Sequence, residues 1–450
     1  MRGREIAKHV IHLAVFILIF ILVEKFLTFL LEPVTYQMTL DREIRKSRKQ
    51  GKEIGMILIG DSTIRAGLDP RVFDSTLESG RITLNAGTSS QSLEGSFYYL
   101  KDLFKQYSPD EVVLGISYNE LLNEPKLLKK ELVVYDRLKS PLIRADYARH
   151  ILSLSESPFL LKSYRYRDDA TQIPVNVKSK LQLLSGGDVQ EMYMGYVPLR
   201  QTWDMERDQI GYWDTDWEEK NVSLEAVQYL EKIVELCGAR HVKLYLVTMP
   251  MATYSFYQNA SVERAHQFIQ RYAEKNGLPY VDMNLWRGRE KENMDSRMND
   301  LDHPSAELAE EFSKILSDII QNGNDERYLY SNVTEAKENI HGILSLQMHT
   351  EPNSDGSRTI FASSIYESYT SIRYSFFIST RDGKEIILQH NGASSSCLLP
   401  GNLVKKCSRI KVEASEVVNG RVEDKMQFVM NIDPSTWDMN DSEVSNVTNR

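Results

Sequence analysis

Cysteine is scarce in this 450-residue chain, which has only Cys237, Cys397 and Cys407. Three cysteines exclude a disulfide framework. Cys397 and Cys407 lie in one region and are the only plausible pair, but two unpaired thiols are the preferred interpretation. The sequence also lacks any Cys-x-x-Cys or His-x-x-x-His spacing. We therefore expect neither a metal nor another cofactor.

The chain also lacks an excess of positive charge, because its formal net charge is −9. Residues 1–52 contain ten Lys/Arg and five Asp/Glu, a net of +5, which leaves 44 Lys/Arg against 58 Asp/Glu, a net of −14, for the rest of the chain. An acidic body argues against a nucleic-acid partner.

One long hydrophobic run stands near the N-terminus, at residues 10–31. As a helix its 22 residues would be about 33 Å long, close to the thickness of the hydrocarbon core. No small-x-small cleavage site follows it, which favours a retained anchor over a signal peptide. The sequence thus predicts a tail at 1–9, a transmembrane anchor at 10–31 and a basic linker at 32–54.

Positive charges flank this run on both sides. Arg2, Arg4 and Lys8 precede it, and six Lys/Arg follow it between residues 42 and 52. The positive-inside rule therefore separates the two possible orientations of the helix only weakly. We expect a single-pass protein of the cell membrane with its N-terminus in the cytoplasm and its body outside. A body facing the cytoplasm would follow only if the second cluster set the topology.

After the linker, apolar strand patterns alternate with amphipathic helix patterns. Strands are predicted at 56–59, 81–87, 111–117, 241–249 and 279–283, and helices at 69–77, 93–104, 223–236, 261–276 and from Pro304 onward. Such alternation predicts an α/β domain over residues 55–322, a three-layer, doubly wound and mostly parallel sheet.

Two further segments depart from this rhythm. Residues 120–221 form a long insertion rich in Arg, Tyr and Trp, which suits a lid or a wall for sugars and anionic polymers; a helical insertion with its own small core is the alternative. Residues 332–433 carry closely spaced strand patterns that predict a small all-β sandwich. The polar tail at 434–450 is predicted to be disordered.

Two short motifs far apart in the chain carry candidate catalytic residues. Ser62 follows the first strand directly, and the carboxyl ends of strands are where open α/β sheets bind their ligands. A serine is a poor nucleophile until a base takes its proton and a third group orients that base. The sequence predicts Ser62 as nucleophile, His303 as base and Asp300 as orienting carboxylate. Asp302 is the alternative orienting group.

These residues resemble the motifs of the SGNH, or GDSL-type, serine hydrolases. The segment ending in Gly-Asp-Ser62 is similar to the family's first block, and Asp300 with His303 is similar to its last block. Gly87 falls where the second block supplies an amide to the oxyanion hole. The third block departs from the family pattern Gly-x-Asn-Asp, because Asn119 lies two positions late and Ser117 occupies the expected place. The resemblance covers about residues 55–322.

The resemblance implies acyl-ester chemistry, with the oxyanion stabilised by the backbone N–H groups of Ser62 and Gly87 and by Asn119. With one membrane helix ahead of it, the layout is similar to envelope members such as teichoic acid D-alanine-transfer proteins and alginate O-acetylation proteins. It implies an extracytoplasmic serine esterase or O-acyltransferase that acts on an acylated cell-envelope polysaccharide. The acyl group we expect is O-acetyl. A transferase would need a membrane partner protein as acyl donor. The alternative is a catalytically inactive polysaccharide-binding or assembly protein that keeps the fold.

Overall fold

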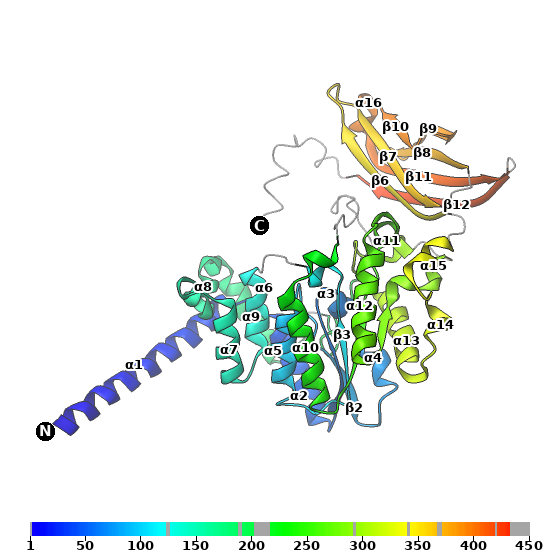
Figure 1. Cartoon of the computed structure of the whole chain (residues 1–450). Helices are drawn as coiled ribbons and strands as arrows, with labels where there is room; N and C mark the ends of the chain where they lie inside the picture. Colours follow the sequence, from blue (N-terminus) through cyan, green and yellow to red (C-terminus); the bar gives the residue numbers. More distant parts are fainter. Residues whose placement is uncertain are drawn as a thin grey trace.

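The computed structural model describes residues 2–122, 127–187, 191–201, 217–290, 294–339, 343–366, 371–418 and 421–432. A long helix projects from an α/β body, and an antiparallel β region covers the opposite end of that body (Figure 1). The predicted tail at 434–450 lies outside the described residues, as do Trp203 and Trp213 of the insertion.

A parallel sheet of five strands forms the centre of the body, which confirms the predicted α/β class. The strand order is β2-β1-β3-β4-β5, and every neighbouring pair is parallel. β1 is buried from Ile54 to Ile59, because a central strand of a parallel sheet is covered on both faces. The strands are β1 (Glu53–Ile59), β2 (Arg81–Asn85), β3 (Glu111–Gly115), β4 (Lys243–Thr248) and β5 (Tyr280–Asp282).

The helices of the body form two packed groups. α13 packs against both α3 and α4, while α5 packs against α10. α12 follows β4 in the chain and contacts β5. These helices are α3 (Ser62–Gly67), α4 (Pro70–Asp74), α5 (Leu93–Leu103), α10 (Leu224–Gly238), α12 (Val262–Asn276) and α13 (Ala306–Asn322).

Several boundaries differ from those predicted. β2 and β3 each end two residues early, at Asn85 and Gly115, because the chain leaves the sheet there to form the edge that carries the site. The helix predicted at 69–77 ends at Asp74. A separate helix, α3, begins at Ser62 itself and was not predicted.

The stretch predicted as a basic linker is largely helical and belongs to the body. α2 (Tyr36–Lys49) begins after Thr35, whose hydroxyl caps the N–H of Met38. Leu40 and Ile44 of this helix are buried in the main hydrophobic core. The basic residues of α2 thus lie on a packed amphipathic helix, which explains their spacing.

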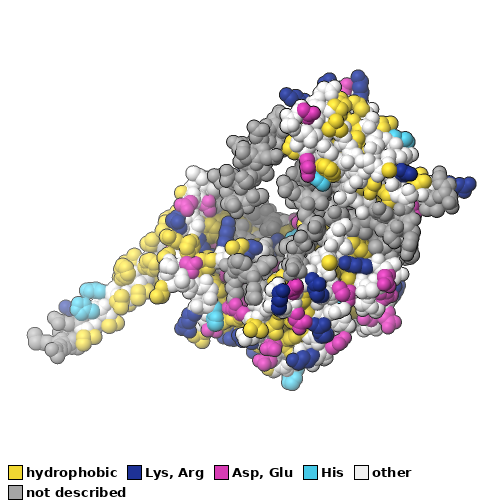
Figure 2. Space-filling view, turned by 45° about the horizontal axis from the view of Figure 1, so that its top comes forward, with side chains coloured by type: hydrophobic (Ala, Val, Ile, Leu, Met, Phe, Trp, Pro, Cys, Tyr) yellow, Lys and Arg dark blue, Asp and Glu magenta, His cyan; other side chains and the backbone are white. Residues whose placement is uncertain are grey.

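α1 (Arg2–Leu31) contains the one segment in the described ranges that is long and apolar enough to cross a membrane, Lys8–Leu31. Its apolar side chains are exposed along the helix (Figure 2). This confirms an N-terminal apolar helix of membrane-spanning length.

The described parts of the insertion pack against different elements of the structure. α6 (Leu128–Arg137) and α7 (Pro141–Ile151) pack on α5, whereas α8 (Lys162–Arg165) and α9 (Ile173–Leu184) contact α1. Residues 191–201 run along β2 and the start of α13: Met194 O accepts the N–H of Asn85 in β2, and Leu199 O accepts the N–H of Ala306 in α13. Trp217 reaches the pocket described below.

The C-terminal strands form two antiparallel sheets, ordered β10-β7-β6 and β12-β11-β8-β9. They share a hydrophobic cluster separate from the main core, which confirms the predicted antiparallel β region. All three cysteines are free. The strands are β6 (Ile343–Pro352), β7 (Arg358–Tyr366), β8 (Ile372–Thr380), β9 (Glu385–Gly392), β10 (Ser396–Leu399), β11 (Cys407–Val418) and β12 (Arg421–Asn431).

Candidate functional site

Ser62 lies at the carboxyl end of β1, an interior strand of the sheet. β1 ends at Ile59, and a Cβ atom on Gly60 would lie 2.8 Å from Ile64 Cγ1 and 3.2 Å from Gly115 Cα, so this turn needs glycine. Asp61 caps the following helix, because its Oδ1 accepts the N–H of Thr63 at 2.9 Å. Ser62 is therefore the first residue of α3, and it is half-buried.

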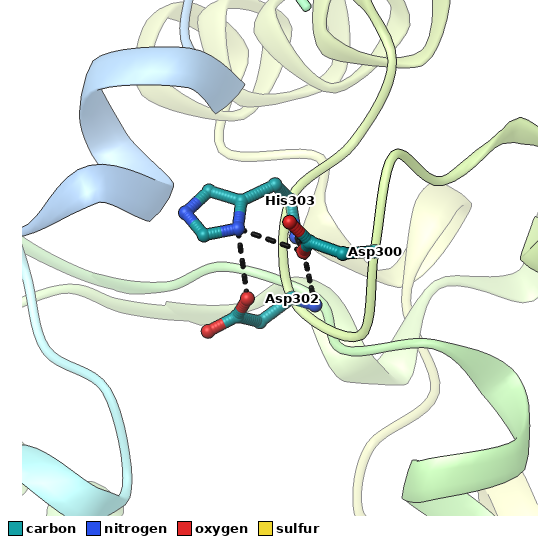
Figure 3. A group of neighbouring side chains, drawn as sticks. All are labelled: Asp300, Asp302 and His303. Atoms are coloured by element: carbon teal, nitrogen blue, oxygen red, sulfur yellow. Dashed lines mark hydrogen bonds and ion pairs between the residues drawn. The ribbon is translucent and has the colours of Figure 1, made fainter. Parts of the chain in front are cut away.

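His303 lies in a turn immediately before α13, between two carboxylates (Figure 3). Its Nδ1 is 2.7 Å from Asp300 Oδ1 and 2.8 Å from Asp302 Oδ1. The same Asp300 oxygen accepts the backbone N–H groups of His303 (2.9 Å) and Asp302 (3.2 Å). In Figure 3 the other ring nitrogen points away from both carboxylates, toward the pale blue ribbon that follows β1.

The two carboxylates strongly favour the charged form of His303. Burial lowers the pKa of the imidazole, but its hydrogen bonds and charge interactions with Asp300 and Asp302 outweigh burial and raise that pKa to about 10. Burial also raises the pKa of Asp300, yet the hydrogen bond with His303 outweighs this and the net pKa is lowered. The pKa of Asp302 is raised by burial and by the charges of Asp300 and Asp61. Asp300 is thus the better-anchored partner of the ring.

A pocket of about 530 Å³ opens between the serine and this turn. Ser62 and Asp302 both line it, as do Ser117 and Asn119 from the segment after β3. Within the described residues no hydrogen bond joins Ser62 to His303. Asp300 and His303 are not among the residues that line this pocket. The structure thus brings Ser62 and Asp302 to one pocket but does not join Ser62 to His303.

Gly87 lies against the first turn of α3, where a Cβ atom would approach Arg65 N to 2.8 Å. Its amide donates to Asn85 Oδ1 at 3.0 Å, and Asn85 Nδ2 donates to the carbonyls of Ile64 (2.8 Å) and Leu68 (2.9 Å). Gly87 would have to release Asn85 to stabilise an oxyanion. Asn119 and Ser117, by contrast, face the pocket.

Glu120 also lines the pocket and was missed in the sequence. Both its carboxylate oxygens are buried and have no hydrogen-bond partner among the described residues. Burial raises its pKa well above the usual range, and the neighbouring charge of Asp61 raises it further. Burial without a partner makes the charged form of this carboxyl group higher in free energy than the neutral form. The neutral form carries an O–H group and can donate a hydrogen bond. The sequence signal that could have identified Glu120 is its position directly after Asn119, a predicted site residue.

No protein-family model matches this chain, and no curated protein gives a significant match. The family resemblance therefore depends on the two motifs and on the site they form.

Arg137 is a second residue that sequence reasoning missed. It is buried, and its Nη1 donates to the carbonyl oxygens of Ala86 (3.3 Å) and Gly87 (3.2 Å). Its guanidinium also lies 4.5 Å from the centre of the Tyr36 ring. Arg137 therefore fixes the turn after β2 and joins it to α2. No motif marks it within the insertion, so no sequence signal could have identified it.

A second histidine–aspartate pair, His266 and Asp282, lies buried behind the pocket wall. His266 Nδ1 is 2.8 Å from Asp282 Oδ2, which also accepts the hydroxyl groups of Tyr118 and Tyr280. Neither member of the pair lines the pocket, whereas Tyr118 does. This network positions the segment that carries Asn119 and Glu120.

Asp300, Asp302 and His303 are also the residues best placed to hold a metal ion. One donor atom from each lies within 4.8 Å of the others, which makes them the only such group in the described ranges. Two carboxylates and an imidazole suit a divalent ion, but here the Nδ1 atom is already hydrogen-bonded to Asp300. The absence of a metal thus stays a prediction.

Proposed function

We propose that this chain is a serine esterase or O-acyltransferase of the SGNH type. The observation that carries the proposal is the shared pocket: Ser62 at the start of α3 and Asp302 beside His303 line one cavity, although 240 residues separate them in the chain. Acyl transfer requires a nucleophile, a base and an orienting carboxylate near one another. Here the nucleophile lines the pocket, and the base follows directly after a residue that lines it.

In this proposal Ser62 Oγ attacks the carbonyl carbon of an ester while His303 Nε2 takes the hydroxyl proton. The tetrahedral oxyanion collapses to an acyl-enzyme as the alcohol leaves with that proton. Water or a second hydroxyl then attacks the acyl-enzyme, and His303 again accepts and returns a proton. Asn119 is the proposed side-chain donor to the oxyanion. The neutral Glu120 carboxyl is suited to donate a hydrogen bond to a substrate oxygen.

The arrangement of the sheet supports the SGNH part of this proposal. From β1 the chain steps outward to β2 and then crosses back over β1 to β3, β4 and β5. This order has a switch point between β1 and β3, next to Ser62, and open sheets bind ligands at such points. Together with the two helix groups, it supports a doubly wound sheet.

The proposed substrate is an acylated cell-envelope polysaccharide outside the cell membrane. The support is the apolar helix α1, which would hold the body at a membrane surface, and the part of the pocket lining that the insertion contributes, which includes Lys130 and Trp217. In a transferase, a membrane partner protein would supply the acyl group.

Fluorophosphonate labelling of the full-length protein, followed by mass mapping of the adduct, tests the proposal. We expect a label on Ser62 that is lost in Ser62→Ala and at least about 10²-fold slower in His303→Ala. Ser90→Ala removes another serine of the pocket and is the matched control that should keep the label. A folded protein that takes no label and cleaves no acetyl ester would exclude the enzyme.

The alternative function, polysaccharide binding or assembly without catalysis, has its own support. Ser62 and His303 are not hydrogen-bonded within the described residues, and the Gly87 amide is engaged by Asn85. This alternative predicts glycan binding that is unchanged in Ser62→Ala, with no label on any serine.

A further inference from the structure

The last turns of α1 are packed into the body rather than joined to it by a flexible tether. Asn176 Nδ2 of α9 donates to the carbonyl of Leu31 at 2.8 Å, and Lys180 Nζ donates to the carbonyl of Phe29 at 2.6 Å. Lys162 Nζ of α8 lies 2.6 Å from Glu32 Oε1. In Figure 1 both helices stand where α1 meets the body.

One of these contacts reaches a carboxylate within the apolar helix. Glu24 lies seven residues before the end of the candidate span at Leu31, about 10 Å along the axis. Its Oε1 accepts the backbone N–H of Ser163 at 3.1 Å and the Thr28 hydroxyl at 3.1 Å, and the Ser163 hydroxyl donates to Oε2. A carboxylate at the edge of the hydrocarbon is costly unless it is paired. If α1 spans the membrane, Ser163 therefore lies beside Glu24 at the depth of the membrane surface.

The segment that makes these contacts also exposes apolar side chains. Outside α1, five of the twelve exposed large hydrophobic residues in the described ranges lie between Leu154 and Leu184. Leu154 is 94% exposed and Leu184 is 75% exposed. In the sequence, these two leucines flank the residues of α8 and α9 that hold α1, which lie between Lys162 and Lys180.

From this geometry we propose that residues 154–184, here called the collar, lie in the lipid–water interface of the membrane. The collar comprises η2 (Leu154–Leu160), α8, η3 (Arg167–Gln172) and α9. Its occupant is the bilayer that surrounds α1, because α8 and α9 pack against the last turns of that helix and the collar exposes leucines next to these contacts in the sequence. Interfacial segments bury such side chains about 5–10 Å into the headgroup and acyl boundary. The proposal assumes that α1 spans the membrane, and it is independent of the catalytic proposal.

Such a collar has a mechanical consequence. Because α1 is held by both α8 and α9 and these would rest on lipid, the body would keep one height and orientation above the membrane. The pocket would then be presented to its substrate at a fixed distance from the bilayer.

Site-specific fluorescence of the full-length protein in vesicles tests the collar. Single cysteines replace Leu154, Leu184, Phe16 or Leu224 in a background in which Cys237, Cys397 and Cys407 are serine. Each is labelled with an environment-sensitive fluorophore, and the vesicles contain nitroxide lipids labelled in the acyl chains. Leu224, 81% exposed on α10 outside the collar, is the matched control, and Phe16 reports on α1.

We expect the probes at 154 and 184 to be quenched at least about twofold more strongly than the probe at 224, and the probe at 16 most strongly. Quenching at 16 with no more quenching at 154 and 184 than at 224 would overturn the collar alone. No quenching at 16 would overturn both the collar and the membrane span. Unchanged thermal unfolding shows that each labelled protein is folded.

Discussion

His303 shares one ring nitrogen between two carboxylates, and this arrangement decides when the residue can act as a base. A base must be neutral to accept the Ser62 proton, whereas the neighbours of His303 raise its pKa to about 10. We therefore expect the rate of fluorophosphonate labelling to rise with pH until about pH 10.

The same raised pKa predicts how folding stability depends on pH. The contribution of protonated His303 to the free energy of unfolding should be fully present below the unfolded pKa of histidine, about 6.5, and should be lost as pH rises through about 10.

Replacing each carboxylate separately distinguishes their roles. Asp302→Asn removes one charge beside the ring, so the rising limb of the pH–rate profile should move to lower pH by about one unit or more. Asp300→Asn should also move this limb to lower pH, and it should in addition lower the highest labelling rate by up to about 10⁴-fold, because the ring loses its anchored partner. The measurement is labelling rate against pH from 6 to 11. Identical midpoints in the wild type and Asp302→Asn would contradict the assignment.

At the scale of elements, the site depends on close contact between the turn after β2 and the start of α3. Asn85 joins them by accepting the N–H of Gly87 and donating to the carbonyls of Ile64 in α3 and of Leu68 just after it. Arg137 holds the same turn from the insertion. This edge is therefore built from three segments that are separate in the chain.

Gly87→Ala tests that contact. The added Cβ would meet Arg65 N at 2.8 Å and Asp61 O at 3.0 Å, and backbone atoms cannot move aside as a flexible side chain can. We expect a loss of about 1–3 kcal/mol in the free energy of unfolding, measured by thermal or chemical denaturation, together with slower labelling of Ser62.

Gly238→Ala is the control for this substitution. Gly238 ends α10, and no atom lies within 4 Å of the position that an added Cβ would take there. Alanine at this position should be neutral or stabilise the protein by up to about 1 kcal/mol. Equal destabilisation by both substitutions would refute the argument from close packing.

At the scale of the whole molecule, α1 and the C-terminal β region lie at opposite ends of the body (Figure 1). The main core extends beyond the predicted end of the α/β domain at 322, because Val333 and Ala336 of α15 (Val333–Glu338) belong to it. The β region keeps its own cluster, and Ser345 in β6 contacts Asp295 of the body through a hydrogen bond.

This arrangement allows a direct test of topology. Leu398 in β10 is 55% exposed, so a cysteine there, in a Cys397→Ser background, should react with a membrane-impermeant maleimide. We expect labelling of intact spheroplasts that express the full chain, because the body is predicted to lie outside the membrane. Labelling only after permeabilisation would reverse the orientation and place the body in the cytoplasm.

The local features of this protein could be predicted from its sequence. The apolar run before Ser62 forms β1, a buried interior strand, and α1 has membrane-spanning length. Asp300 lies three residues before His303 and is hydrogen-bonded to its ring. Each depends on residues within one or two turns of chain, where periodicity and capping act.

Tertiary packing alone decided the rest. It brought Ser62 and Asp302 to one pocket, engaged the Gly87 amide with Asn85 and buried the Glu120 oxygens without a partner among the described residues. It also divided the insertion between α1, the sheet edge and the pocket. The reason is physical: burial, pKa and the availability of a hydrogen-bond donor are set by neighbours in space, and here those neighbours come from distant parts of the chain.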